Sequence, residues 1–109
     1  MQPDKQHLHN RILVIFRRFL REEEELRGLI DAQGADMTVT ESKWQFTLPS
    51  LYVLCCTQDS QFAQIGYSTF RKLLYRFPTN KLLAPFGGKV MVGKQRSNVN
   101  RTTYELRRV

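Results

Sequence analysis

The sequence has few residues of the kinds that bind metals or cross-link chains. It contains two cysteines and two histidines in 109 residues. Cys55 and Cys56 are adjacent, and a disulfide between neighbours would strain the intervening peptide, so we expect free thiols and a reducing compartment. His7 and His9 lie near the N-terminus, where we expect solvent-exposed side chains. Because no spaced Cys/His ligand set occurs in the sequence, neither a metal nor a cofactor is expected.

Long apolar runs are also missing. Uncharged apolar runs such as Ile12 to Phe16 are far shorter than the roughly 20 residues that span a bilayer. The first ten residues, MQPDKQHLHN, lack the apolar core and small-residue cleavage site of a signal peptide. We therefore expect a soluble intracellular protein with no membrane partner.

Acidic residues are scarce in the second part of the chain. Residues 67–109 hold ten Lys and Arg against one acid, Glu105, a net charge of +9, whereas residues 1–66 hold seven bases and nine acids, a net charge of −2. Apolar content of 41% with 11% aromatic residues is typical of a folded protein, so residues 1–109 are expected to form one domain that carries this charge. A basic surface on a near-neutral scaffold is typical of proteins that bind polyanions, which makes nucleic acid the first partner to test.

Apolar residues recur at three- and four-residue steps through the N-terminal part and predict one long helix over residues 4–33, within a segment 1–34. Such a helix is longer than a small domain can cover, so we expect it to project and to pair with a second copy as a homodimer. The heptad spacing has one misfit, Glu22, in an acidic run that is expected to be solvated. The alternative is that the apolar stripe packs on its own chain. The residues expected at the dimer interface are Leu8, Ile12, Ile15, Phe19 and Leu26.

Residues 44–109 are expected to form the core of the domain. Trp44, Phe46 and Leu48 alternate with polar residues, which predicts a short strand, and Pro49 then starts a buried helix over 49–57, capped by Thr47 or Leu48. Ser68 is expected to cap a further helix over 69–77 that is apolar on one side and basic on the other, and Pro78 ends it. The alternating segments 89–92 and 103–106 predict a β-hairpin with a long basic tip over 93–102.

This order of elements and charge resembles the winged helix-turn-helix superfamily, an α+β fold with a C-terminal hairpin wing. The resemblance covers residues 44–109 and implies that helix 68–77 enters the major groove of DNA while hairpin 89–108 acts as the wing. An extra turn over 79–84 departs from the pattern and lengthens the connection to the wing. The residues that the resemblance assigns to nucleic-acid binding are Ser68, Thr69, Arg71, Lys72, Arg76, Lys94, Arg96, Asn98 and Arg101.

The expected function is double-stranded DNA binding, as a dimeric transcriptional regulator or a plasmid or phage maintenance factor. The compartment would be the cytoplasm, with the nucleoid, or the nucleus of a eukaryote. The alternatives are a protein-interaction module whose basic face meets an acidic partner, and RNA binding. Aromatic residues such as Phe70 and Tyr75 at helical spacing favour a core over a stacking platform for single strands. Neither catalytic spacing of carboxylates, His and Cys nor a sign of a small-molecule substrate is present in the sequence, so an enzyme is not expected.

Overall fold

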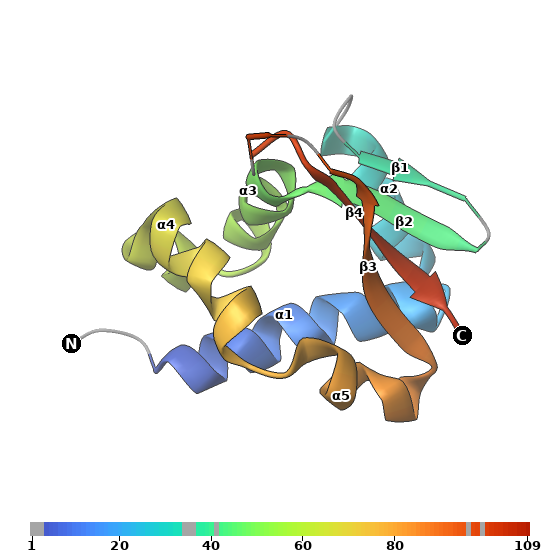
Figure 1. Ribbon diagram of the computed structural model, residues 1–109, viewed down its shortest axis with the longest axis horizontal. Helices are drawn as coiled ribbons and strands as arrows, with labels where there is room; N and C mark the ends of the chain where they lie inside the picture. Colours follow the sequence, from blue (N-terminus) through green and yellow to red (C-terminus); the bar gives the residue numbers. More distant parts are fainter. Residues whose placement is uncertain (1–3, 34–36, 41, 96, 99) are drawn as a thin grey trace.

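In the computed structural model, which describes residues 4–33, 37–40, 42–95, 97–98 and 100–109, five α-helices and a four-stranded antiparallel sheet form an α+β fold (Figure 1). The helices are α1 (Lys5–Leu20), α2 (Glu24–Gln33), α3 (Leu48–Gln58), α4 (Gln61–Arg76) and α5 (Thr79–Leu83), with a 3-10 turn, η1 (Ala84–Phe86), after α5. The strands are β1 (Met37–Val39), β2 (Lys43–Thr47), β3 (Gly88–Lys94) and β4 (Thr103–Arg108), in the spatial order β1-β2-β4-β3. None of the described helices is long and apolar enough to cross a membrane.

The prediction of one long helix over residues 4–33 is wrong, because the chain breaks between α1 and α2. Glu22 adopts a positive φ of 60° at the break, and its side chain is 75% exposed. A continuous helix would place this carboxylate in the buried stripe, where an unpaired charge is costly. The acidic run also suits a break. Acids are unfavourable at the C-terminus of α1 and favourable in the first turn of α2, where Glu24 and Glu25 lie. Arg18 holds the turn by donating to Glu23 from Nε (2.9 Å) and Nη2 (2.7 Å).

The apolar stripe of the two helices is the core of the chain itself. Phe16 of α1 packs on Trp44 and Phe46 of β2, with ring centroids 5.9 Å away in both cases. A second copy therefore cannot pack on this stripe, and the prediction that it forms a dimer interface is wrong. Whether the chain is a homodimer through another surface stays a prediction. The residues proposed for that interface are all at most 6% exposed: Leu8, Ile12, Ile15, Phe19 and Leu26.

The predicted helix after the first long strand is confirmed as α3. Thr47 caps it, since its Oγ1 accepts from the Ser50 amide (3.3 Å) and Ser50 Oγ accepts from the Thr47 amide (3.1 Å). Leu51 and Leu54 are fully buried, whereas Val53 is 48% exposed, so the helix is not buried on every side.

Helix α4 consists of two helical segments joined by a kink at Gly66, and the segment that corresponds to the predicted helix over 69–77 begins at Tyr67. The whole helix runs from Gln61, and Gly66 breaks the helical geometry with φ 78° and ψ 164°, a conformation essentially restricted to glycine. Ser68 therefore lies inside the helix, and its prediction as the N-cap is wrong. The predicted inward positions Phe70 and Leu73 are buried, and α4 ends at Arg76, before Pro78.

His9 is buried rather than exposed as predicted, at 1% accessibility. Its Nε2 lies 2.9 Å from Thr79 Oγ1, and its ring stacks on Phe77 at 4.9 Å. Burial lowers the pKa of His9 because it disfavours the imidazolium. Helix α1 is thereby joined to Phe77, just after α4, and to the first residue of α5.

The predicted hairpin is present as β3 and β4, with β3 on the edge of the sheet. Asn80 of α5 covers part of this edge, since its Nδ2 donates to the Val90 carbonyl (3.0 Å) and its Oδ1 accepts from the Val90 amide (2.7 Å). The extra turn that lengthens the connection to the hairpin thus supports its edge strand.

Candidate nucleic-acid interface

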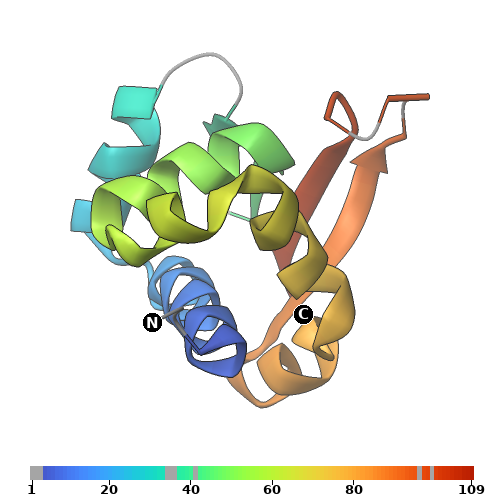
Figure 2. The same cartoon turned by 90° about the vertical axis from the view of Figure 1, so that its left-hand side faces the viewer.

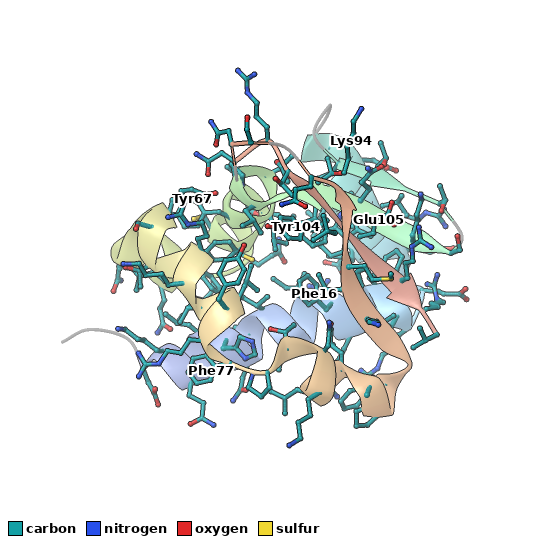
Figure 3. All side chains as sticks on the ribbon, viewed as in Figure 1. Phe16, Tyr67, Phe77, Lys94, Tyr104 and Glu105 are labelled. Carbon is teal, nitrogen blue, oxygen red and sulfur yellow. The ribbon has the colours of Figure 1, made fainter. Side chains whose placement is uncertain are left out.

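The hairpin stands across from helix α4 (Figures 1 and 2), and hydrogen bonds between side chains join the two elements. The Tyr67 hydroxyl donates to Asn100 Oδ1 at 2.6 Å, and the Tyr75 and Tyr104 hydroxyls lie 2.9 Å apart. Tyr67 and Tyr104 both carry their rings on the sides of α4 and β4 that face each other (Figure 3). The basic half of α4 and the hairpin are therefore coupled in orientation.

The exposed side of α4 carries the predicted helix residues in two groups. Ser68, Lys72 and Arg76 are exposed and follow one another at four-residue steps, so they form one line along the helix. Arg71 and Thr69 are half-buried. The Arg71 guanidinium lies 5.9 Å from the centre of the Tyr67 ring, on the side that faces the hairpin. Arg71 is thus partly a packing residue, and Lys72 is the more accessible cation.

The hairpin contributes exposed polar and basic side chains near its tip. Lys94, Asn98 and Arg101 are exposed, as a groove-contacting loop requires. Asn98 also shapes the tip, since its carbonyl accepts from the Arg101 amide (2.9 Å) and its Oδ1 accepts from the Asn100 amide (2.9 Å). Arg96, the remaining predicted contact, lies outside the described residues.

Two arginines of residues 67–109 bind groups of the fold away from α4. Arg108 donates from Nη2 to the Phe19 carbonyl (2.9 Å), with its guanidinium 4.6 Å from the Phe19 ring. Arg107 donates from Nε to Glu105 (2.7 Å), which also accepts from Lys43 (3.1 Å). Burial acts to raise the pKa of Glu105, but these two hydrogen bonds outweigh it and lower the pKa. The charge available beside α4 is therefore smaller than the +9 of residues 67–109.

Tyr67 and Tyr104 stay protonated near neutral pH, because the pKa of each is raised. Burial and the hydrogen bond with Tyr75 raise the pKa of Tyr104, and burial raises that of Tyr67, while Arg71 acts in the opposite direction on both. Their hydroxyls thus remain hydrogen-bond donors.

The sequence prediction missed the four residues that join the two elements. In the sequence, nothing distinguishes the three tyrosines, Tyr67, Tyr75 and Tyr104, from ordinary aromatic residues. Asn100 is likewise one of several polar residues in a loop. The only available signal was the four-residue spacing of Tyr67, Arg71 and Tyr75, which places them on one line of the helix.

Comparisons with known proteins add no relationship: no family model matches the chain, and neither do any curated protein or solved structure. Among the described residues, no three His, Cys, Asp or Glu side chains gather as a metal site would require. Cys55 is buried, which raises the pKa of its thiol and disfavours the reactive thiolate.

Proposed function

We propose that this chain binds double-stranded DNA as a winged helix, with the segment from Tyr67 to Arg76 in the major groove and the β3–β4 hairpin on the adjacent backbone or minor groove. The observation that carries the proposal is the pair of links from Tyr67 to Asn100 and from Tyr75 to Tyr104. These links join an exposed basic helix to an exposed basic hairpin. In the winged-helix mode of binding, one such element enters the major groove of the duplex and the other contacts the adjacent backbone or minor groove. A role in transcription or in plasmid or phage maintenance would follow from such binding.

The order of elements supports this proposal. A buried helix, a basic amphipathic helix and a hairpin follow β2 in the sequence, as in the superfamily that the chain resembles. Departures are the break that forms α2, the added edge strand β1, and α5 with η1 between α4 and β3. Since α5 packs on β3 through Asn80, the longer connection supports the hairpin in place.

The chemistry of the exposed side chains also suits a duplex. Lys72 and Arg76 are long cationic side chains on one line of α4, and Lys94 and Arg101 extend from the hairpin. Cations in these positions neutralise phosphates and release counterions, so affinity should depend steeply on salt. Ser68 and Thr69 add hydroxyls that can reach phosphates or base edges.

The test is the salt dependence of binding to a random duplex, measured by fluorescence anisotropy. If about five cations contact phosphates, the plot of log affinity against log salt has a slope of about −4 to −5. Replacing one cation of each element, Lys72→Ala with Lys94→Ala, should lower the steepness by about two units and weaken binding about tenfold.

The matched control removes the same charge from another region. Arg21→Ala with Arg27→Ala changes exposed arginines next to the acidic run, and should leave the slope unchanged. Equal losses in both double variants would mean that net charge alone attracts the duplex. Absence of duplex binding together with binding of a polyglutamate peptide would support the protein-interaction alternative, and a preference for single-stranded or duplex RNA would support RNA binding.

A further inference from the structure

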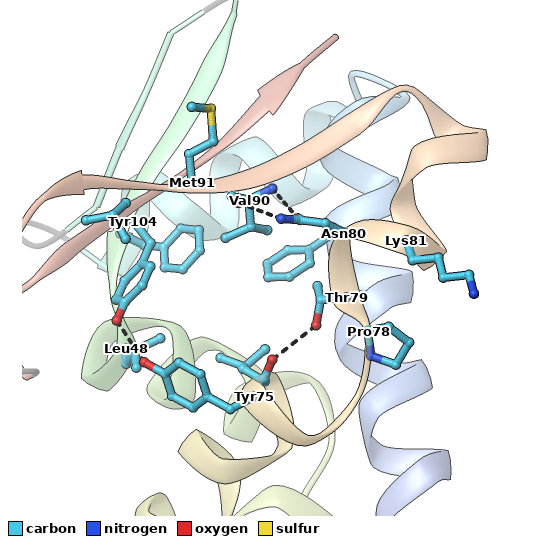
Figure 4. Close-up of a pocket in the computed structure, with 13 residues that line it drawn as sticks. Leu48, Tyr75, Pro78, Thr79, Asn80, Lys81, Val90, Met91 and Tyr104 are labelled. Atoms are coloured by element: carbon cyan, nitrogen blue, oxygen red, sulfur yellow. Dashed lines mark hydrogen bonds between the residues drawn. The ribbon is translucent and has the colours of Figure 1, made fainter.

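A cavity of about 460 Å³ lies between α4, α5 and the hairpin, next to the face proposed for DNA (Figure 4). This volume is in the range of small-molecule sites. Its walls are mainly apolar and include the aromatic rings of Phe16, Phe46, Tyr75 and Tyr104. Because the side chains that line it come from five separate segments of the chain, no sequence motif marks the cavity.

The polar groups that line the cavity differ in whether they already have hydrogen-bond partners. Thr79 Oγ1 is engaged with His9 (2.9 Å), and the side-chain amide of Asn80 is engaged with both backbone groups of Val90. The amino group of Lys81 points away from the cavity (Figure 4). The hydroxyls of Tyr75 and Tyr104 have two hydrogens between them, and their mutual hydrogen bond uses one. The other is available to an acceptor.

The electrostatic surroundings of this tyrosine pair favour an anionic acceptor. A hydroxyl that donates to an ionised acceptor forms a stronger hydrogen bond than one that donates to a neutral acceptor. Of the residues that line the cavity, none is acidic, and the chain carries a net charge of +7. A carboxylate is therefore better matched than an ammonium group at this position.

We propose that this cavity binds a small planar aromatic carboxylate, with its ring among Leu74, Val90 and Val92 and its carboxylate at the hydroxyls of Tyr75 and Tyr104. Aromatic walls favour a flat ring, because stacked and edge-to-face contacts are both available there. The proposal concerns a second site and holds whether or not the chain binds DNA.

The probe is 2-naphthoate, titrated into the folded chain by isothermal titration calorimetry, with 2-naphthylmethylammonium as the matched cation on the same ring. We expect saturable binding of the carboxylate with a Kd between about 10 µM and about 1 mM, and binding of the cation at least about tenfold weaker. No saturable heat from naphthoate would overturn the proposal. Equal affinity for both probes would overturn the assignment of the carboxylate to the tyrosine pair.

Variants at the cavity separate this site from adsorption on the basic surface. Val92 pairs with Tyr104 across the strands, so both side chains share the face that lines the cavity, and Val92 is 54% exposed. Val92→Trp should fill the cavity and weaken naphthoate at least about tenfold. Val53→Trp places the same side chain at an exposed position of α3 outside the cavity and should bind as the wild type does. Unchanged affinity in a folded Val92→Trp chain would overturn the proposal.

A milder variant covers the case in which Val92→Trp does not fold. Tyr75→Phe with Tyr104→Phe removes both hydroxyls and leaves no unpaired partner, so this variant should fold normally, and naphthoate should bind several-fold more weakly. Unaltered binding by this variant would again remove the carboxylate from the tyrosine pair. Sedimentation of the same samples tests a second copy as the occupant: a dimer that Val92→Trp converts to monomer would overturn the small-molecule assignment.

Discussion

The hydroxyl of Tyr67 donates to Asn100 Oδ1 across 2.6 Å and joins α4 to the tip of the hairpin 33 residues later. Tyr75 forms the second link further along the same helix, with Tyr104 at 2.9 Å. Both links arise from one line of α4, because residues four apart lie on the same side of a helix. Tyrosine hydroxyls thus join the hairpin, which the sheet and Asn80 already hold, to the basic helix.

Tyr67→Phe should loosen the tip without unfolding the chain. The lost hydrogen bond is exposed, so stability should fall by less than about 1 kcal/mol, while the Arg101 amide should exchange faster with solvent. Hydrogen exchange followed by NMR measures this. Tyr52→Phe is the control, because its hydroxyl donates to the Phe62 carbonyl, away from the hairpin. Equal exchange of the tip in wild type and Tyr67→Phe would refute the link.

Gly66→Ala should destabilise the chain by about 1–3 kcal/mol, because alanine rarely adopts φ 78° with ψ 164°. Nothing lies within 4 Å of the added Cβ, so the cost comes from the backbone alone. The matched change, Gly28→Ala, is inside α2 with equally open space and should stabilise by up to about 1 kcal/mol. Urea unfolding compares the two, and the same sign of change in both would contradict the kink at Gly66.

Ile15→Glu should unfold the chain rather than dissociate a dimer. Ile15 is 4% exposed in the core, and an unpaired carboxylate there should cost more than about 4 kcal/mol. Its neighbour Val14 is 39% exposed, so Val14→Glu should change stability by less than about 1 kcal/mol. Circular dichroism during thermal unfolding distinguishes them. A folded, monomeric Ile15→Glu chain from a dimeric wild type would restore the interface that we have rejected.

Acidification from about pH 7.5 to about pH 5.5 should destabilise the chain through His9. Burial lowers the pKa of His9 in the fold, so the unfolded chain binds a proton more readily. The contribution to stability is complete above the unfolded pKa of about 6.5 and is lost as the pH falls toward the folded pKa. The pKa values of Glu23 and Glu105 are lowered, so these carboxylates affect stability only at more acidic pH.

The measurement is the free energy of unfolding in urea at a series of pH values. His9→Gln should flatten the dependence between about pH 7.5 and about pH 5.5, whereas His7→Gln, at an exposed position, should leave it as in the wild type. A slope that His9→Gln does not change would mean that other groups are responsible.

The elements that the sequence predicted correctly are those set by neighbouring residues. Thr47, Pro49 and Ser50 encode the start of α3, and alternating residues encode the hairpin, because caps and strand patterns act over a few positions. The break after α1 was missed because the three- and four-residue spacing continues on both sides of it. Glu22 was the one residue in this spacing that indicated a break, because burial of an unpaired carboxylate in an apolar stripe is costly.

Features that depend on distant segments were not predictable from local patterns. His9 is buried by Thr79 and Phe77, which lie about 70 positions later, and the cavity forms only where α1, the sheet and α5 come together. The hydrogen bonds between α4 and the hairpin also join residues that are far apart in the sequence. Polar aromatic residues such as Tyr67 and Tyr104 have partners that a single sequence does not reveal.

The most direct test of the central claim is the map of backbone amide chemical shifts as a random DNA duplex is added to the labelled chain at low salt. We expect the largest shifts within residues 67–76 and 94–102, and we expect them to return toward the free values as salt is raised, because phosphate contacts are screened. Shifts concentrated in α1 and α2, or no shifts at all with the chain folded, would contradict the claim.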